Sequence, residues 1–451
     1  MERPVNKMES MPVRPLLLQM SWPIMLSMMI QALYNLVDSM FVAKLSSDGF
    51  VALSLAFPVQ SIIVALCAGS AVGLNALISR RLGEHRPDLA SRIAVNGYFV
   101  FGVISVLFLV FGLTGSRAFI SLFSDVPAVI GYGEQYISIV TVFAFTVAGQ
   151  ICSERVLQAS GNTIGPMIGQ SSGALLNILL DPLLIFGVGP FPRLEVAGAA
   201  IATVISQFFG MVLTLWMVRR SPVLKLTFRG FRPDLHVIRA IYEIGLPAIL
   251  IQLLSSVMML GMNKVMAYFT VNGVFLLGAY YKLQSFCFMP VFGLNNGMIP
   301  IIGYNYGARN PQRIHATVRF ALVMALSVMS LGTLLFAAAP TLLLRLFSAD
   351  AAQMADGVIA LRMLSPVFLF ASVSVILCAA FQAVGAPRSS LLVSVLRQLG
   401  FLLPLAILLG FLRPGAIWLA FPLSEGVACV LSLLLYRHIS RTRVDPLSQA
   451  D

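Results

Sequence analysis

The sequence predicts an all-α integral membrane protein with twelve transmembrane helices in two parallel six-helix bundles. Of its 451 residues, 58% are hydrophobic and only 11% are charged. Apolar stretches of about 20 residues or more also recur along the whole chain, and each can cross a hydrocarbon core of roughly 30 Å as a helix. A soluble domain would carry about 25% charged residues, so a soluble fold is excluded.

The first half of the chain contains six predicted helices. The first, at 15–43, follows Arg3, Lys7 and Arg14, a pattern that signal peptides share. Its apolar run is too long for a signal-peptide core and lacks a small-residue cleavage site, so we expect a retained helix. The next five are apolar stretches between short polar segments, at 50–79, 93–115, 133–158, 163–187 and 195–218.

The second half repeats this plan after a long basic segment. We expect its helices at 241–269, 274–301, 317–346, 357–383, 389–411 and 415–437. The predicted domains are therefore an N-terminal lobe, 1–218, a cytoplasmic linker, 219–240, and a C-terminal lobe with its tail, 241–451.

Identities at one constant offset indicate an internal duplication. Pro23 and Pro247 are 224 residues apart, and the same offset relates Gln60 to Gln284, Gly83 to Gly307, Pro87 to Pro311, Phe123 to Phe347, Gln158 to Gln382 and Gly161 to Gly385. Six helices is an even number, so the repeats are parallel. Two parallel bundles enclose a cleft that can open alternately to either side, which points to a carrier.

The positions of the charges give the orientation. If both termini are cytoplasmic, the inner segments hold 20 Lys and Arg and the outer segments hold 6. This positive-inside bias predicts a multi-pass protein of the cell membrane with both termini in the cytoplasm. The net charge of +12 then reflects topology and contact with lipid head groups, so no nucleic-acid partner is expected.

Three motifs resemble the multidrug and toxic compound extrusion (MATE) family of transporters. They are "SWPIMLSMMIQALYNLVDSMFVAKL" in the first helix, "LLNILLDPLLIFG" with "VAGAAIATVISQ" in the fifth and sixth, and "MPVFGLNNGMIPIIGYNYGARNPQR" around the eighth. The resemblance covers essentially the whole chain. It implies two lobes around a V-shaped central cleft, and export of organic cations driven by an inward flow of protons or sodium ions.

Polar residues of the first lobe share one depth and form the candidate coupling site. At a rise of 1.5 Å per residue, Asp38 and Asp181 each lie roughly 9 Å below the outer ends of their helices, and Thr203 lies roughly 12 Å below its own. Asn177 and Tyr34 lie one turn deeper than the two acids. Pro182 leaves the carbonyl of Ile178 without a helical partner.

These oxygen-bearing groups suit a proton or a sodium ion. Two carboxylates close together in a low dielectric cannot both stay ionised, so one can titrate. The family resemblance implies the same cation site at Asp38, Asn177, Asp181 and Thr203. A purely structural role remains the alternative for each residue: a buried acid or an interhelical Asn can simply hold two helices together.

Of the other charged residues within the predicted helices, four are candidates for the substrate cleft or for structural ion pairs: Glu154, Lys282, Arg397 and Glu425. Glu154 lies near the inner end of the fourth helix beside Arg155, where a local salt bridge is the simpler interpretation. Glu425 and Arg397 reach mid-depth, and we expect them to form a structural pair, with Lys282 as a competing partner. Each of the four is also a candidate for the substrate cleft.

The leading hypothesis is a secondary active antiporter that exports amphipathic organic cations by alternating access, coupled to H⁺ or Na⁺ through the N-terminal lobe. The alternative is an exporter or flippase for one endogenous metabolite or lipid-linked precursor. No nucleophile with a base and no metal-binding motif lies in the spans, so an enzyme is not expected. Beyond the coupling ion no cofactor is expected; the expected partners are small cationic substrates and the bilayer, and the expected state is a monomer.

Overall fold

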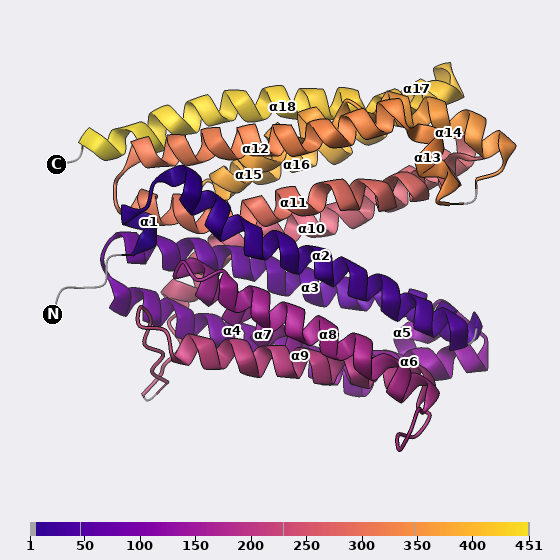
Figure 1. Ribbon diagram of the computed structural model, residues 1–451, viewed down its shortest axis with the longest axis horizontal. Helices are drawn as coiled ribbons and strands as arrows, with labels where there is room; N and C mark the ends of the chain where they lie inside the picture. The colour runs from indigo at the N-terminus through magenta and orange to yellow at the C-terminus, as the bar shows by residue number, and fades with distance from the viewer. Residues whose placement is uncertain (1–5, 46, 229, 348, 450–451) are drawn as a thin grey trace. The chain divides into compact units, whose positions relative to one another are not determined.

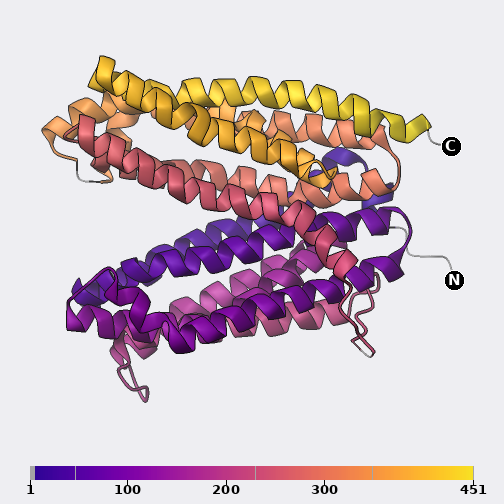
Figure 2. The ribbon, with the colours of Figure 1, turned by 180° about the vertical axis from the view of Figure 1, so that it is seen from behind.

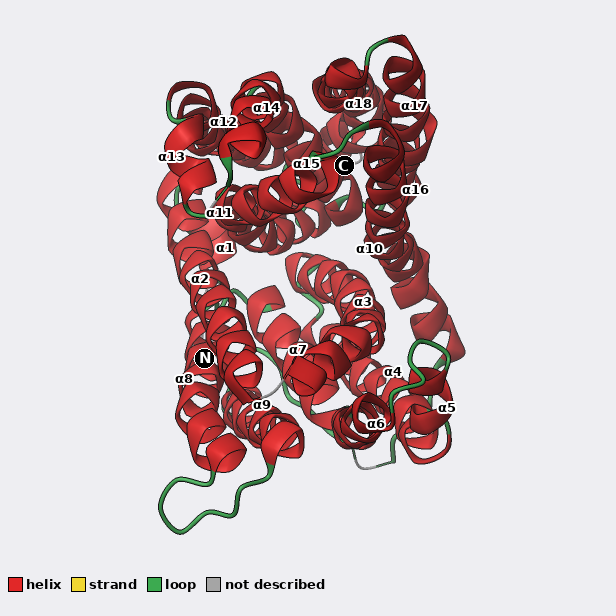
Figure 3. Ribbon diagram, turned by 90° about the vertical axis from the view of Figure 1, so that its right-hand side faces the viewer, coloured by secondary structure: helices red, strands yellow, loops and turns green. Residues whose placement is uncertain are grey.

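The computed structural model describes residues 6–45, 47–228, 230–347 and 349–449, without the side chains of residues 35, 36, 38–40, 42–45, 47 and 449. Every regular element within these ranges is a helix, as Figure 3 shows. The predicted all-α fold is therefore confirmed.

The described residues of the first half of the chain form nine helices, and Figure 1 labels them. Their bounds are α1 (Lys7–Ser10), α2 (Val13–Leu45), α3 (Ser47–Gly83), α4 (Pro87–Thr114), α5 (Ser116–Ser121), α6 (Pro127–Val142), α7 (Phe145–Ala159), α8 (Ile164–Phe186) and α9 (Glu195–Arg219).

The part of the second half that the structure describes forms nine α-helices together with shorter π and 3₁₀ segments. Their bounds are α10 (Leu235–Phe269), α11 (Gly273–Gly307), α12 (Pro311–Ala338), α13 (Pro340–Arg345), α14 (Ala351–Leu364), α15 (Val367–Ala383), α16 (Pro387–Val395), η1 (Leu396–Leu402), α17 (Leu403–Leu412), η2 (Pro414–Leu419), α18 (Ala420–Ile439), η3 (Ser440–Val444) and η4 (Asp445–Gln449).

Ten helical stretches within the described residues are long and apolar enough to span a membrane. Two further spans are bent pairs: α6 meets α7 at 43°, and α14 meets α15 at 44°. Counting each bent pair as one span gives the predicted number of twelve transmembrane spans. The predicted helices 133–158 and 357–383 are thus each formed by two helices, and the second break follows from Pro366, which has no N–H to continue the helical bonds.

The structure repeats at the offset of 224 residues that the sequence identities predict. Helices α4 and α5 correspond to α12 and α13 at this offset, and the two bent pairs occupy corresponding places. Backbone conformations repeat too: His85 and Arg309 have φ angles of 56° and 54°, although non-glycine residues rarely adopt positive φ. The duplication therefore extends to details of the backbone.

The chain forms two compact units that do not follow its two halves. The N-unit is Leu26–Gly245, and the C-unit is Met1–Met25 together with Leu246–Asp451. Helices α2 and α10 therefore each pass through both units. The predicted lobes follow the covalent duplication, whereas these units also reflect how the first turns of α2 and α10 pack.

The C-unit has an aromatic core and holds the N-terminal segment. Phe336 of α12 and Phe368 of α15 have ring centroids 4.7 Å apart. Arg313 of α12 donates to the carbonyl oxygens of Met8 and Met11 at 2.9 and 2.8 Å. Figure 2 shows α16, α17 and α18 of this unit from behind.

In the N-unit, close helix packing positions the candidate site. Helices α8 and α9 run side by side (Figures 1 and 3). A Cβ added to Gly173 of α8 would lie 3.1 Å from the carbonyl oxygen of Ser206 on α9. On the other side of α9, a Cβ at Gly210 would lie 2.9 Å from the side-chain amide of Gln150 on α7. Glycines thus let α9 approach both of its neighbours.

Candidate functional site

A buried acid and amide form the centre of the candidate site. Asp181 is fully buried, and Asn177 and Thr203 are 2% and 7% exposed. With the Asn177 amide oriented to satisfy both neighbours, its nitrogen donates to Asp181 Oδ2 and its oxygen accepts from the backbone N–H of Thr203, each at 3.3 Å. The structure therefore brings together three of the predicted residues, from two helices.

Local sequence explains why these side chains face inward. Gly169, Gly173, Asn177 and Asp181 recur at every fourth position of α8, and all four are buried. Residues four apart lie on one face of a helix. The two glycines therefore let α9 approach, and Asn177 and Asp181 face that helix. Helix α8 continues past Pro182 to Phe186, which leaves the carbonyl of Ile178 without its usual N–H partner.

Asp38 and Tyr34 lie on α2. The side chain of Asp38 lies outside the described residues, so the predicted proximity of its carboxylate to that of Asp181 stays a prediction. Tyr34 is half-buried one helical turn before it.

Glu154 is a second buried acid of the N-unit, on α7. It is 8% exposed, and its Oε1 accepts from Gln150 Nε2 at 2.9 Å. The adjacent Arg155 donates to Gln158 Oε1 at 2.9 Å. Each of the two charged groups therefore has a side-chain amide of its own helix as a partner.

Arg397 and Glu425 form an ion pair in the C-unit. Arg397 Nη1 lies 3.2 Å from Glu425 Oε1, and both side chains are largely buried. Arg397 belongs to the π-helical segment η1, and its carbonyl oxygen accepts from Ser424 Oγ at 2.5 Å. Lys282 is exposed and makes no ion pair with any described residue, so Arg397 is the partner of Glu425.

Sequence reasoning missed several buried polar groups near these sites. The Ser206 hydroxyl lies one turn beyond Thr203 on α9, and it has no hydrogen-bond partner among the described residues. The same holds for the Tyr280 hydroxyl and Gln398 Oε1 in the C-unit. The spacing of three residues from Thr203 is a signal that could have indicated Ser206.

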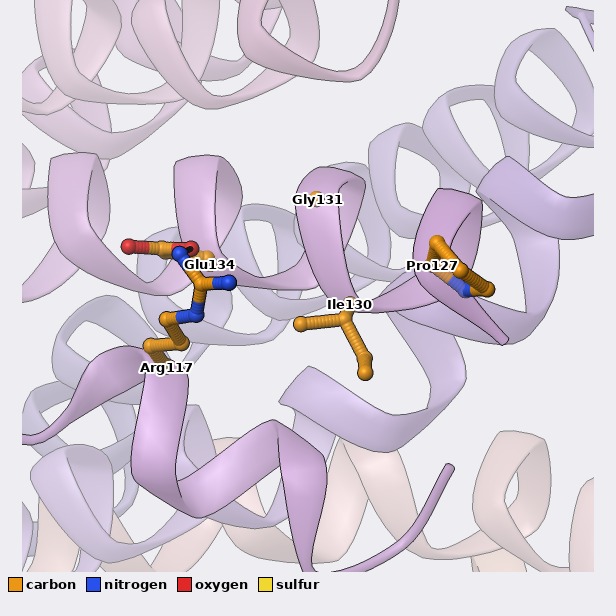
Figure 4. Close-up of a pocket in the computed structure, with 5 residues that line it drawn as sticks. All are labelled: Arg117, Pro127, Ile130, Gly131 and Glu134. Carbon is orange, nitrogen blue, oxygen red and sulfur yellow. Dashed lines mark ion pairs between the residues drawn. The ribbon is translucent and has the colours of Figure 1, made fainter. Parts of the chain in front are cut away.

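One surface pocket lies between α5 and α6 of the N-unit. It has a volume of about 260 Å³ and is lined by Arg117, Pro127, Ile130, Gly131 and Glu134 (Figure 4). Arg117 Nη1 is 3.9 Å from Glu134 Oε2, and the Arg117 side chain is mostly exposed. Exposed pairs of this kind contribute little binding energy, so we assign no function to this pocket.

The chemistry available at Asp181 is cation binding. A carboxylate buried among apolar helices is costly unless a proton or another cation neutralises it. The Asn177 amide and the Ile178 carbonyl, which lacks its usual helical N–H donor at Pro182, add the kind of oxygen and amide groups that hold small cations inside transporters.

Comparisons with known proteins agree with this fold. The sequence matches the MatE family over residues 23–183 and 247–408. It is 26% identical to the FAD transporter of Shewanella oneidensis, over 97% of this chain and 98% of that protein. It is also 26% identical to the multidrug export protein MepA of Staphylococcus aureus, over 97% of this chain and 96% of that protein. A solved structure of a multidrug resistance transporter in an outward-facing conformation matches with a TM-score of 0.90 at 25% identity, over the full length of both chains.

Proposed function

The chain belongs to the MatE family of membrane transporters, and on that premise we propose that it is an antiporter that exports amphipathic organic cations in exchange for protons. Members of this family are transporters and not enzymes. The proposal rests on one observation above all, the fully buried Asp181 in contact with Asn177 within the N-unit.

In the proposed cycle, a proton binds at Asp181 and its predicted partner Asp38. Protonation removes the charge that the buried carboxylate otherwise carries, and the helices of the N-unit can then repack. The same carboxylate attracts an organic cation when it is deprotonated. Proton and substrate therefore compete for one charge, which is the basis of exchange.

Sodium is the other candidate coupling ion, because Asn177, Thr203 and the Ile178 carbonyl supply oxygens for it. We favour the proton, since a pair of acids can share one. We also propose that both termini are cytoplasmic, because basic residues gather on one side of the predicted topology. The proposed oligomeric state is a monomer.

The experiment is dye export from proteoliposomes, with ethidium as the substrate and a pH gradient or a sodium gradient imposed separately. Wild type is compared with Asp181→Asn and Asp38→Asn. Glu243→Gln is the matched control, because Glu243 is exposed and paired with Arg239 on its own helix. We expect export with the pH gradient alone and its loss in both Asp variants.

Export driven only by sodium would make the same residues a sodium site. Unchanged export in Asp181→Asn would contradict a coupling role for the N-unit.

The second candidate function is export of one anionic metabolite. The relative that transports FAD is as similar to this chain as the multidrug exporter, over nearly the full length of both. Vesicles loaded with FAD separate the two functions: release of FAD without any transport of ethidium would favour the metabolite exporter.

A further inference from the structure

The guanidinium of Arg397 in the C-unit is held from one edge only. Its Nη1 donates to Glu425 Oε1 and Oε2 at 3.2 and 3.5 Å. Its Nε–H and Nη2–H groups donate to no described residue, and the side chain is 22% exposed, so these groups are accessible. Nε and Nη2 together form a planar fork that matches two oxygens of a carboxylate or a phosphate.

The backbone around Arg397 fixes the position of this fork. Arg397 lies in the π-helical segment η1, and π turns inside longer helices are frequent at functional sites. Pro404 follows in α17 and has no N–H for the carbonyl of Gly400, which interrupts the α-helical bonding here. The Arg397 carbonyl accepts from Ser424 Oγ of α18. The backbone and the ion pair therefore hold Arg397 in place without a ligand.

A second hydrogen-bond donor lies in the core of the same unit. Tyr280 of α11 is 1% exposed, and its hydroxyl has no hydrogen-bond partner among the described residues. Its ring packs against Phe421 of α18 with centroids 5.5 Å apart, and Phe421 lies one helical turn before Glu425. A buried hydroxyl without a partner is costly, so a ligand that accepts from it gains affinity.

The charge of the C-unit favours an anion. Lys264 of α10 and Lys282 of α11 are exposed, and neither forms an ion pair with a described residue. Glu425 neutralises Arg397, so the two lysines leave an excess of positive charge in the spans of this unit. Charged groups inside membrane spans commonly mark the path of a substrate or an ion.

We propose that the free edge of Arg397, together with the Tyr280 hydroxyl, binds the acid group of a transported organic molecule, a carboxylate or a phosphate. The inference goes beyond the proposed function, because an organic cation does not need such a site. It rests on that function only in taking the bound molecule to be a substrate. The contact with Glu425 is structural, since it holds the guanidinium by Nη1 and leaves the other edge free.

The test compares dyes that differ only in one acid group. Rhodamine 110 has a free carboxylate, and rhodamine 123 is its methyl ester. Fluorescein and its methyl ester form a second pair that lacks the cationic ring system. Fluorescence anisotropy of each dye with the purified full chain, in detergent free of phospholipid, gives the dissociation constants. We expect each acid to bind about tenfold more tightly than its ester, as a charge-assisted bidentate contact predicts.

Two variants assign this preference to the proposed groups. Arg397→Lys keeps a charge beside Glu425 but has no planar fork, so the acid and the ester should bind within about twofold of each other. Arg319→Lys is the matched control, because it makes the same change at an exposed arginine of α12. Tyr280→Phe removes a hydroxyl without a partner, so it should fold normally and bind the acids about threefold more weakly, with the esters unaffected.

Two results would overturn the inference. One is equal binding of acid and ester by the wild type in both pairs. The other is a full preference for the acid in folded Arg397→Lys or, if that variant does not fold, in Tyr280→Phe. Displacement of the acid dyes by phosphatidylglycerol but not by benzoate would make a lipid head group the occupant, and would also overturn it.

These outcomes are separate from the test of the proposed function, because ethidium has no acid group. If ethidium is exported and neither dye pair shows a preference, only this inference fails. If ethidium is not exported but the fluorescein pair shows a preference that Arg397→Lys abolishes, the acid site stands and the proposed cationic substrate is wrong.

Discussion

Asn177 and Asp181 lie one turn apart on α8, and the amide of the first joins the carboxylate of the second to the backbone of α9. The first prediction concerns this link. Asn177→Ala removes two hydrogen bonds from a buried site, so we expect the free energy of unfolding to fall by about 1–3 kcal/mol. Ion-driven export of ethidium should fall with it.

Thermal unfolding in detergent and vesicle export measure the two effects. Ser172→Ala is the control, because Ser172 is half-buried on the same helix and its hydroxyl donates to the Ile168 carbonyl of that helix. Full export by Asn177→Ala at normal expression would show that Asn177 is only an interhelical contact.

Much of the fold could be predicted because hydrophobicity and duplication are strong signals. Asn177 and Asp181 could be predicted to share a face from their spacing alone, and the shared depth of Thr203 could be predicted from the helix ends. The bend within α6–α7 could not, since that apolar stretch is long enough to be one helix and contains no proline, whereas Pro366 is a sequence signal for the bend within α14–α15.

The packing of α2 and α10 into opposite units also could not be predicted. A Gly-x-x-x-Gly pattern indicates a close helix neighbour, but it does not say which helix. The partner of Gly297 is Ser21, far away in sequence, and only the three-dimensional arrangement reveals it. The lack of a hydrogen-bond partner for the buried Ser206 hydroxyl among the described residues could not be predicted either, because hydrogen bonds depend on side-chain directions.

The second prediction concerns the ion pair of the C-unit. Glu425→Ala leaves Arg397 in a largely buried place without its partner, so we expect the free energy of unfolding to fall by about 3 kcal/mol. Replacing both residues, as Arg397→Leu with Glu425→Leu, should restore most of this loss because no buried charge remains.

A double-mutant cycle on thermal unfolding measures the coupling between these two residues. If the double variant is stable and exports ethidium, the pair is structural. A stable double variant without export would instead assign the pair to substrate binding.

The third prediction concerns Ser206. Its hydroxyl is buried without a partner among the described residues, so Ser206→Ala should raise the free energy of unfolding by about 1 kcal/mol. Ser105→Ala is the comparison, because the Ser105 hydroxyl is buried but donates to the carbonyl of Phe101 at 2.7 Å. A stabilised variant with impaired export would show that the unsatisfied hydroxyl serves transport, whereas a destabilised variant would contradict the absence of a partner.

The fourth prediction concerns Arg313, which fixes the N-terminal segment. Its guanidinium donates to Asn305 Oδ1 at 3.0 Å and to the carbonyl oxygens of Met8 and Met11. Arg313→Ala removes three charge-assisted hydrogen bonds, so the amides of residues 6–11 should exchange with deuterium about tenfold faster, while the rest of the C-unit stays protected. Hydrogen exchange with mass spectrometry measures this, and Arg319→Ala is the control because Arg319 is exposed on the same helix. Equal exchange in both variants would mean that the apolar side chain of Met8, which is fully buried, holds the segment without Arg313.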